Sequence, residues 1–354
     1  NEPGVITYGE VGSQGWLDGG GVPLLTPSVI TSRVNKASPI DGTAEEEKGL
    51  PMPNKILLVA SENKKLERIA TKSSLTRPIV ARYVAGTTLD EALDVTDQLN
   101  AVGIAVSLDL LGESVHDERQ AQDATDEYIL TIRSMATRSP GATVSVKLSQ
   151  LGIVISSEIA EANLRRLLEV AREHGCEVEV DMEHTSVGRE TLAIFRRVQP
   201  DFPKTRVAVQ AYLRSSIEDL HAFGDRPPRI RLVKGAFDET IDATIRDKAD
   251  VTAQYQHLAR WALAHLPDPA FGTHDDACID TVKQAARELG VAKDAFEFQM
   301  LQGVRRDVQE RLVREGYRVR VYLPYGTQWY PYLTRRMAER PANLLLFLRS
   351  VIGS

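Results

Sequence analysis

The chain has 354 residues, of which 26% are charged and 42% hydrophobic, and its formal net charge is -6. This composition is typical of a soluble globular protein, and the negative charge argues against a nucleic-acid partner. The two cysteines, Cys176 and Cys278, are too few for a disulfide framework or a zinc site, so we expect a cytoplasmic protein. No apolar run reaches the length that spans a membrane.

Residues 1–51 differ in composition from the rest of the chain. Seven glycines fall within the first 21 positions, and the acidic run Glu45-Glu46-Glu47 follows later. The segment contains no secretory signal pattern, and its composition is typical of a flexible segment. We therefore expect residues 1–51 to be flexible and dispensable, and residues 52–354 to form the functional domain, beginning with helices.

Helical and strand patterns alternate from about residue 56. Residues 62–84 are predicted to be helical, and Thr88-Leu-Asp-Glu91 is a capping box that opens a helix reaching about Val102. After it, short runs rich in apolar and β-branched residues each precede a helical stretch. The expected strands are 105–110, 143–148, 177–182, 205–212, 229–233, 270–274, 296–301 and 318–323.

Helices are predicted in the intervals between these strands, and Ser215-Ser-Ile-Glu218 is a second capping box. Eight strand-then-helix units predict an α/β fold, a (β/α)8 barrel of the TIM type. A doubly wound sheet is the rival fold, but no G-x-G-x-x-G follows the first strand. The expected helices are 118–137, 157–174, 188–198, 215–223, 240–265, 277–289, 304–315 and 329–340.

Polar side chains occur at every predicted strand end, where the active groups of such barrels lie. Lys147 ends the apolar run Val-Ser-Val, and a purely structural barrel does not need it there. Its alternative is a lysine that extends to solvent, and the alternative for Asp181 is a cap for the following loop. The set at the strand ends is Asp109, Lys147, Asp181, Glu183, Gln210, Arg231, Lys234, Thr273, His274, Asp275, Glu297, Gln299 and Tyr322.

Arg231-Leu-Val-Lys-Gly-Ala236 places two cations three positions apart, followed by a turn of small residues. Gly235 permits close approach of the backbone, so its N–H groups and Lys234 could hold a phosphate or pyrophosphate. Together with Thr273 and His274 on the next strand, the motif favours a phosphate-bearing cofactor. His274 could instead bind zinc, but no H-x-H or H-E-x-x-H accompanies it, and we expect no metal site.

The last predicted helix carries Tyr332, Arg335, Arg336 and Glu339 on one face. An ordinary surface helix has apolar residues at this spacing. Two planar guanidinium groups are suited to grip a carboxylate. The alternative is a solvated face with an ion pair between Arg335 and Glu339.

Taken together, these motifs resemble the proline dehydrogenase family, over roughly residues 62–350 and in its short monofunctional bacterial form. One departure is Phe237, where the family often has tyrosine. The segments that carry the resemblance are Ser-Leu-Asp-Leu-Leu-Gly-Glu113, Ser-Val-Lys-Leu-Ser-Gln-Leu-Gly152, Asp181-Met-Glu, Val-Gln210-Ala-Tyr-Leu, Arg231-Leu-Val-Lys-Gly-Ala236, Gly272-Thr-His274, Phe296-Glu-Phe-Gln-Met-Leu, Tyr322-x-Pro-x-Gly and Tyr332-Leu-x-Arg-Arg-x-x-Glu339.

The resemblance implies a site for L-proline beneath the last helix, which the family sets over the C-terminal mouth of the barrel. Arg335 and Arg336 would clamp the proline carboxylate, with Lys147 and Glu339 completing the ion-pair network. Asp181 and Arg231 would lie near the reacting centre. The remaining contacts implied are Tyr322 and Tyr332 against the proline ring, and Met182, Gln210, Arg231, Lys234, Gly235, Ala236, Thr273 and His274 against FAD.

The family's reaction implies further partners. A hydride would pass from the ring carbon beside nitrogen to flavin N5, giving 1-pyrroline-5-carboxylate, and the electrons would go on to a membrane quinone. That acceptor implies transient peripheral contact with the inner face of the membrane, and a separate dehydrogenase would take the product on to glutamate. Two alternatives stay open: a Schiff-base aldolase using Lys147 or Lys234, and a barrel that serves only as a binding scaffold.

Overall fold

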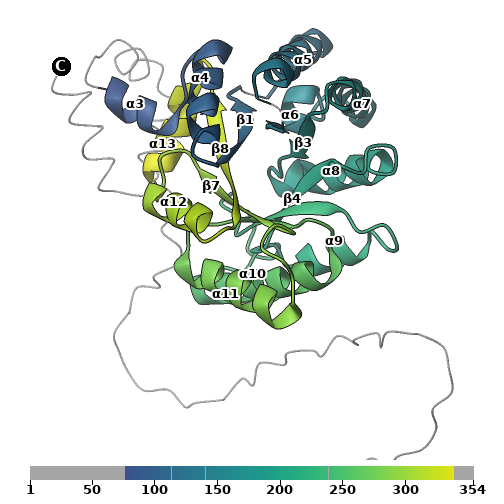
Figure 1. Ribbon diagram of the computed structural model, residues 1–354. Coiled ribbons are helices and arrows are strands. Elements are labelled where there is room, and N and C mark those ends of the chain that lie inside the picture. The colour runs from purple at the N-terminus through teal and green to yellow at the C-terminus, as the bar shows by residue number, and fades with distance from the viewer. Residues whose placement is uncertain (1–75, 113, 140, 238, 339–354) are drawn as a thin grey trace, which may run out of the picture. The chain divides into compact units, whose positions relative to one another are not determined.

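The computed structural model describes residues 76–112, 114–139, 141–237 and 239–338. Eight strands form a closed barrel in sequence order, and every neighbouring pair, including β1 with β8, is parallel (Figure 1). The predicted (β/α)8 barrel is therefore confirmed. The strands are β1 Ala105–Leu110, β2 Thr143–Val146, β3 Glu177–Val180, β4 Arg206–Gln210, β5 Arg229–Val233, β6 Ala270–Gly272, β7 Glu297–Leu301 and β8 Arg318–Tyr325.

Helices separate the strands, and none in the described part of the chain is both long and apolar enough to cross a membrane. The capping box at α4 is confirmed, since Thr88 Oγ1 accepts from the Glu91 N–H and Glu91 Oε2 accepts from the Thr88 N–H. The helices are α3 Arg77–Tyr83, α4 Leu89–Asn100, α5 Glu118–Arg138, α6 Leu148–Leu151, α7 Ser157–Glu173, α8 Thr185–Val198, α9 Ser216–His221, α10 Lys248–His265, α11 Asp276–Leu289, α12 Arg306–Arg314 and α13 Trp329–Ala338.

Two expectations about helix starts are wrong. The helix predicted from residue 240 begins at Lys248, because Asp247 caps it through the N–H groups of Ala249 and Asp250, at 2.8 and 3.0 Å. The capping box at Ser215 does not form, since the Ser215 hydroxyl donates to the carboxylate of Asp219 at 2.8 Å. The predictions for residues 1–51 and for helix over 62–75 lie outside the described residues.

Alternate residues of the strands face different surroundings, as the pleat requires. In β1, Val106 and Leu108 are fully buried and belong to the apolar core that also includes the inner faces of the helices. Ser107 and Asp109, on the other face of the strand, form hydrogen bonds or ion pairs with residues of other strands. The barrel therefore has an apolar shell outside and a polar interior, and this interior contains the candidate site.

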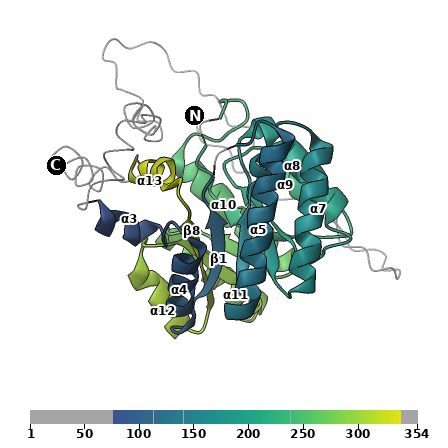
Figure 2. The same ribbon diagram turned by 90° about the horizontal axis from the view of Figure 1, so that it is seen from above.

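Helix α13 packs on the C-terminal end of the barrel, as predicted. Trp329 and Leu333 belong to a second apolar cluster with Leu111, which follows β1, and with Val304, which follows β7. The same cluster includes residues of α3, and Figures 1 and 2 both show α3 and α13 side by side. These contacts fix the helix beside the strand ends where polar side chains gather.

Candidate active site

Five side chains from different strands meet at the C-terminal end of the barrel. Lys147, directly after β2, donates to Asp109 and lies 3.2 Å from the carboxylate of Asp181 and 3.1 Å from the hydroxyl of Tyr322. Tyr322 donates to Asp181 at 2.7 Å, and Arg231 donates to the other oxygen of the same carboxylate. Lys147 thus joins the cluster instead of extending to solvent, and Asp181 binds two cations instead of capping a loop.

The charges of this cluster and its burial shift the pKa values of its members in different directions. Burial opposes the charge of Lys147, but Asp109, Tyr322 and Asp181 hold its pKa well above the usual range. Burial also opposes ionisation of Asp181, but Arg231 and Lys147 outweigh it and lower the pKa. For Asp109 burial prevails, and the pKa is raised. A Schiff-base lysine must be neutral to attack a carbonyl, so the raised pKa of Lys147 argues against an aldolase that uses Lys147.

The polar interior continues toward the N-terminal end of the barrel. Glu297 was predicted at a C-terminal strand end, but it is the first residue of β7, so it lies at the opposite end, paired with Arg206 and Arg320 at 3.0 and 2.9 Å. Glu179 of β3 lies between this pair and the cluster at the mouth, bonded to Arg206 and Arg231. Sequence reasoning missed Glu179, Arg206 and Arg320.

We expect the charges of this interior to make the fold less stable at acid pH. The carboxylates of Glu179, Asp181 and Glu297 are buried, but their cationic neighbours lower each pKa below its usual value. Their contribution is therefore present above the unfolded pKa values, about 4, and lost as pH falls through the folded-state values. Asp109, whose pKa is raised, offsets this in part. The thermal unfolding midpoint should stay level from pH 7 to 5 and fall below pH of about 4; a midpoint unchanged at pH 3 would contradict this assignment.

The residues predicted to hold a cofactor phosphate lie together after β5 and β6. Lys234 Nζ donates to Asp275 and to Thr252, both at 2.7 Å. Gly235 has φ +101°, and an added Cβ would lie 2.1 Å from the ring of Tyr212, so only glycine fits there. In the next loop, His274 Nε2 accepts from the Leu301 N–H at 2.9 Å. Ala236 and Thr273 adjoin these groups in the chain.

The end of β4 offers a polar atom that fits a bound cofactor. Gln210 is buried, and its side-chain oxygen has no hydrogen-bond partner among the residues described. A buried amide oxygen without a donor is unfavourable, so a ligand that donates to it would stabilise the site. Met182, also buried, follows Asp181 at the end of β3. Phe237, at the usual tyrosine position, packs its ring 4.7 Å from that of His184.

The clamp predicted on α13 is described in part. Tyr332 is buried in the cluster beneath the helix, and the guanidinium of Arg336, one turn later, lies 5.7 Å from its ring. Arg335 lies on the same helix, and Glu339 lies outside the described residues. The helix therefore carries Tyr332 and Arg336 at the C-terminal end of the barrel, as the predicted site requires.

Known proteins are similar to this chain in both sequence and architecture. Residues 92–345 match the family model described as proline dehydrogenase. The chain belongs to the proline dehydrogenase family. It is 37% identical to proline dehydrogenase 1 of Bacillus subtilis over 297 residues, which cover 84% of this chain and 98% of that protein. It is also 37% identical to the Deinococcus radiodurans proline dehydrogenase, over 84% of this chain and 97% of the relative.

A solved structure of the family agrees with the barrel. Proline utilization A from Bdellovibrio bacteriovorus, inactivated by N-propargylglycine, is 28% identical with a TM-score of 0.71. The match covers 81% of this chain but only 36% of that longer one. The bifunctional protein PutA of Escherichia coli is 26% identical, and the matched part is 26% of its length. This chain thus corresponds to one part of those larger proteins, and oxidation of proline is its family's reaction.

Proposed function

We propose that the chain oxidises L-proline to 1-pyrroline-5-carboxylate with FAD as cofactor and a quinone as the final acceptor. The observation that carries the proposal is the ion-pair chain Arg231–Asp181–Lys147 at the C-terminal end of the barrel, with Tyr322 bonded to two of its members. These ion pairs place fixed charges of both signs at one site. A zwitterionic amino acid needs such an arrangement.

Different residues around the cluster would bind different groups of proline. Asp181, held ionised by its two cations, would attract the charged ring nitrogen. Arg335 and Arg336 of α13 would bind the carboxylate as paired forks, with Glu339 and Lys147 balancing their charge. The rings of Tyr322 and Tyr332 would enclose the apolar ring of the substrate. Such a closed site excludes water and orients the ring carbon beside nitrogen.

The residues after strands β4, β5 and β6 fit FAD. The chemistry that FAD supplies when bound is acceptance of a hydride at flavin N5 from the proline ring, once the ring nitrogen has released a proton to the medium. Lys234 and the backbone of Gly235 and Ala236 would hold the pyrophosphate, and Gln210 would bond the flavin ring through its buried amide. Arg231 would stabilise negative charge on the reduced ring. Met182, Thr273 and His274 complete the proposed cofactor contacts.

The electrons removed from proline need an acceptor, and the product needs a further enzyme that consumes it. We infer that a membrane quinone takes the electrons during transient contact of this otherwise cytoplasmic protein with the inner face of the membrane. A separate dehydrogenase would oxidise the product further toward glutamate. We also propose that residues 1–51 contribute to neither step.

A visible spectrum of the purified protein, recorded before and after adding L-proline under anaerobic conditions, tests the proposal. We expect a yellow protein whose flavin band bleaches with proline and returns when a soluble quinone is added. D-Proline serves as the control and should leave the band intact. A colourless protein would remove FAD from the proposal, and a band that proline leaves unchanged would remove the substrate.

A further inference from the structure

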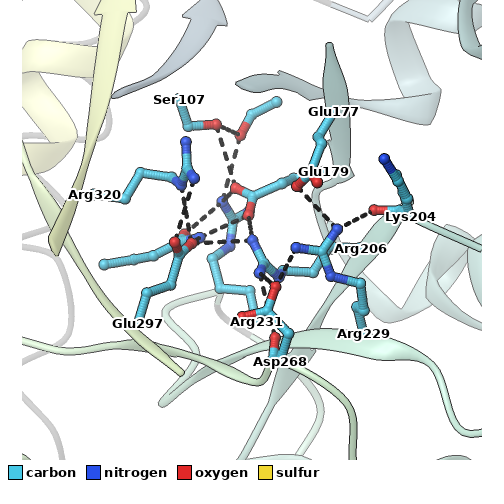
Figure 3. A network of polar contacts seen from close by, with 12 residues as sticks. Ser107, Glu177, Glu179, Lys204, Arg206, Arg229, Arg231, Asp268, Glu297 and Arg320 are labelled. Carbon is cyan, nitrogen blue, oxygen red and sulfur yellow. Dashed lines mark hydrogen bonds and ion pairs between the residues drawn. The ribbon is translucent and has the colours of Figure 1, made fainter. Parts of the chain in front are cut away.

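Glu179 lies within the network of hydrogen bonds and ion pairs that fills the barrel interior (Figure 3). Its side chain is 1% exposed. One oxygen accepts from Arg206 at 2.5 Å and from Gln299 at 2.6 Å, and the other accepts from Arg231 at 3.0 Å and Ser107 at 3.3 Å. Four donors from four other strands therefore fix this carboxylate in one place.

Arg231 is held at both of its terminal nitrogens. Nη1 donates to Glu179, below it in the barrel, and Nη2 donates to Asp181 at the mouth. An arginine side chain has many rotamers, and each of its bonds must offset the entropy of holding one of them. Two carboxylates on opposite sides select a single orientation, in which the guanidinium also lies 5.4 Å from the ring of Tyr322.

We propose that Glu179 is a positioning residue for the reaction, because it holds Arg231 in the orientation that reaches Asp181 and the proposed flavin. The inference rests on the proposed function, in which Arg231 stabilises charge on the reduced ring. Glu179 itself lies beneath the site and acts through Arg231.

Glu297 provides a matched comparison. It is equally buried at 1% exposure, and its pKa is also lowered by arginines. Its bonds in the described part of the chain go to Arg206, Gln299, Arg318 and Arg320. Arg206 and Gln299 are also partners of Glu179. Neutralising Glu297 therefore disturbs the same interior but leaves in place the two carboxylates that hold Arg231.

The test compares Glu179→Gln with Glu297→Gln in crystal structures, thermal unfolding, flavin midpoint potential and proline kinetics. Both variants should lower the unfolding midpoint. Only Glu179→Gln should separate Arg231 from Asp181 beyond 4 Å, the distance limit of an ion pair, make the flavin potential more negative and lower kcat. The expected loss in kcat is about tenfold, since one charge-assisted hydrogen bond becomes a neutral one.

Two outcomes would overturn the proposal: an Arg231–Asp181 pair that survives in Glu179→Gln with kcat unchanged, or equal losses of kcat and potential in both variants. If Glu179→Gln does not fold, Glu179→Asp serves instead, because it keeps the charge on a shorter side chain. It should give the same separation of Arg231 from Asp181 and the same loss of kcat. If the wild-type protein shows no bleaching by proline, the proposed function fails, and the crystal structures alone decide whether Glu179 positions Arg231.

Discussion

Replacing Lys147 with methionine is expected to abolish most of the activity and to destabilise the fold. The ammonium group is the cation that Asp109 and Asp181 share, so its removal leaves two buried carboxylates facing each other. Breaking a buried pair by deleting one partner costs about 3–5 kcal/mol of stability. Asp181 would then bind a proton more readily and lose its attraction for the ring nitrogen. We expect kcat/KM for proline to fall by at least about 100-fold, two steps of 1.4 kcal/mol.

A double variant separates these two effects. Adding Asp109→Asn to Lys147→Met removes one of the stranded charges, so the free energy of unfolding should recover in part while the activity stays low. Lys283→Met serves as the control, because it removes an ammonium that pairs with Glu315 on the outside of the barrel, and its kcat/KM should match that of the wild type. A Lys147→Met protein with normal stability and turnover would show that the ion pairs at the mouth carry neither function.

The barrel was predictable because each of its units carries its own signal. Apolar runs of four to eight residues gave the eight strands, and amphipathic spacing gave the helices between them. The errors fell where tertiary contacts override local pattern. The predicted helix includes residues 240–247, but Thr244 bridges to Leu213 and Asp247 caps the helix later. At Ser215 the neighbouring Asp219 takes the hydroxyl that a capping box requires.

The clustering of polar side chains was predictable at the mouth of the barrel and much less so at its floor. Lys147, Asp181, Arg231 and Tyr322 stand out in sequence because each lies at or near the end of an apolar strand, and the structure brings them together. Asp109 belongs to the same set, but the positioning carboxylate Glu179 is different, since its role depends on register between strands distant in sequence. A signal did exist. Charged residues alternate with valine in Glu177-Val-Glu-Val and Arg318-Val-Arg-Val, a period of two that marks an inward face in a strand covered by helices.

Replacing Arg336 with methionine is expected to raise the KM for proline while leaving the flavin spectrum unchanged. Methionine preserves an unbranched side chain on α13, so the packing of Tyr332 beneath the helix should persist. The variant lacks the guanidinium that would donate two charge-assisted hydrogen bonds to the carboxylate. That loss amounts to roughly 2–4 kcal/mol, or about 30-fold to 1000-fold in KM. Arg336→Lys keeps the charge but not the forked guanidinium, so its KM for proline should lie between those of the wild type and Arg336→Met.

The comparison with L-prolinamide decides whether the effect belongs to the carboxylate. Prolinamide has the same ring but an uncharged amide, so its KM should be high in the wild type and nearly unchanged in Arg336→Met. Arg314→Met, on the exposed face of α12, controls for the loss of a surface arginine and should not alter either KM. If proline and prolinamide lose affinity equally in Arg336→Met, the residue shapes the site without binding the carboxylate. If neither KM changes, Arg336 is not part of the clamp, and carboxylate recognition must rest on Arg335 and Lys147.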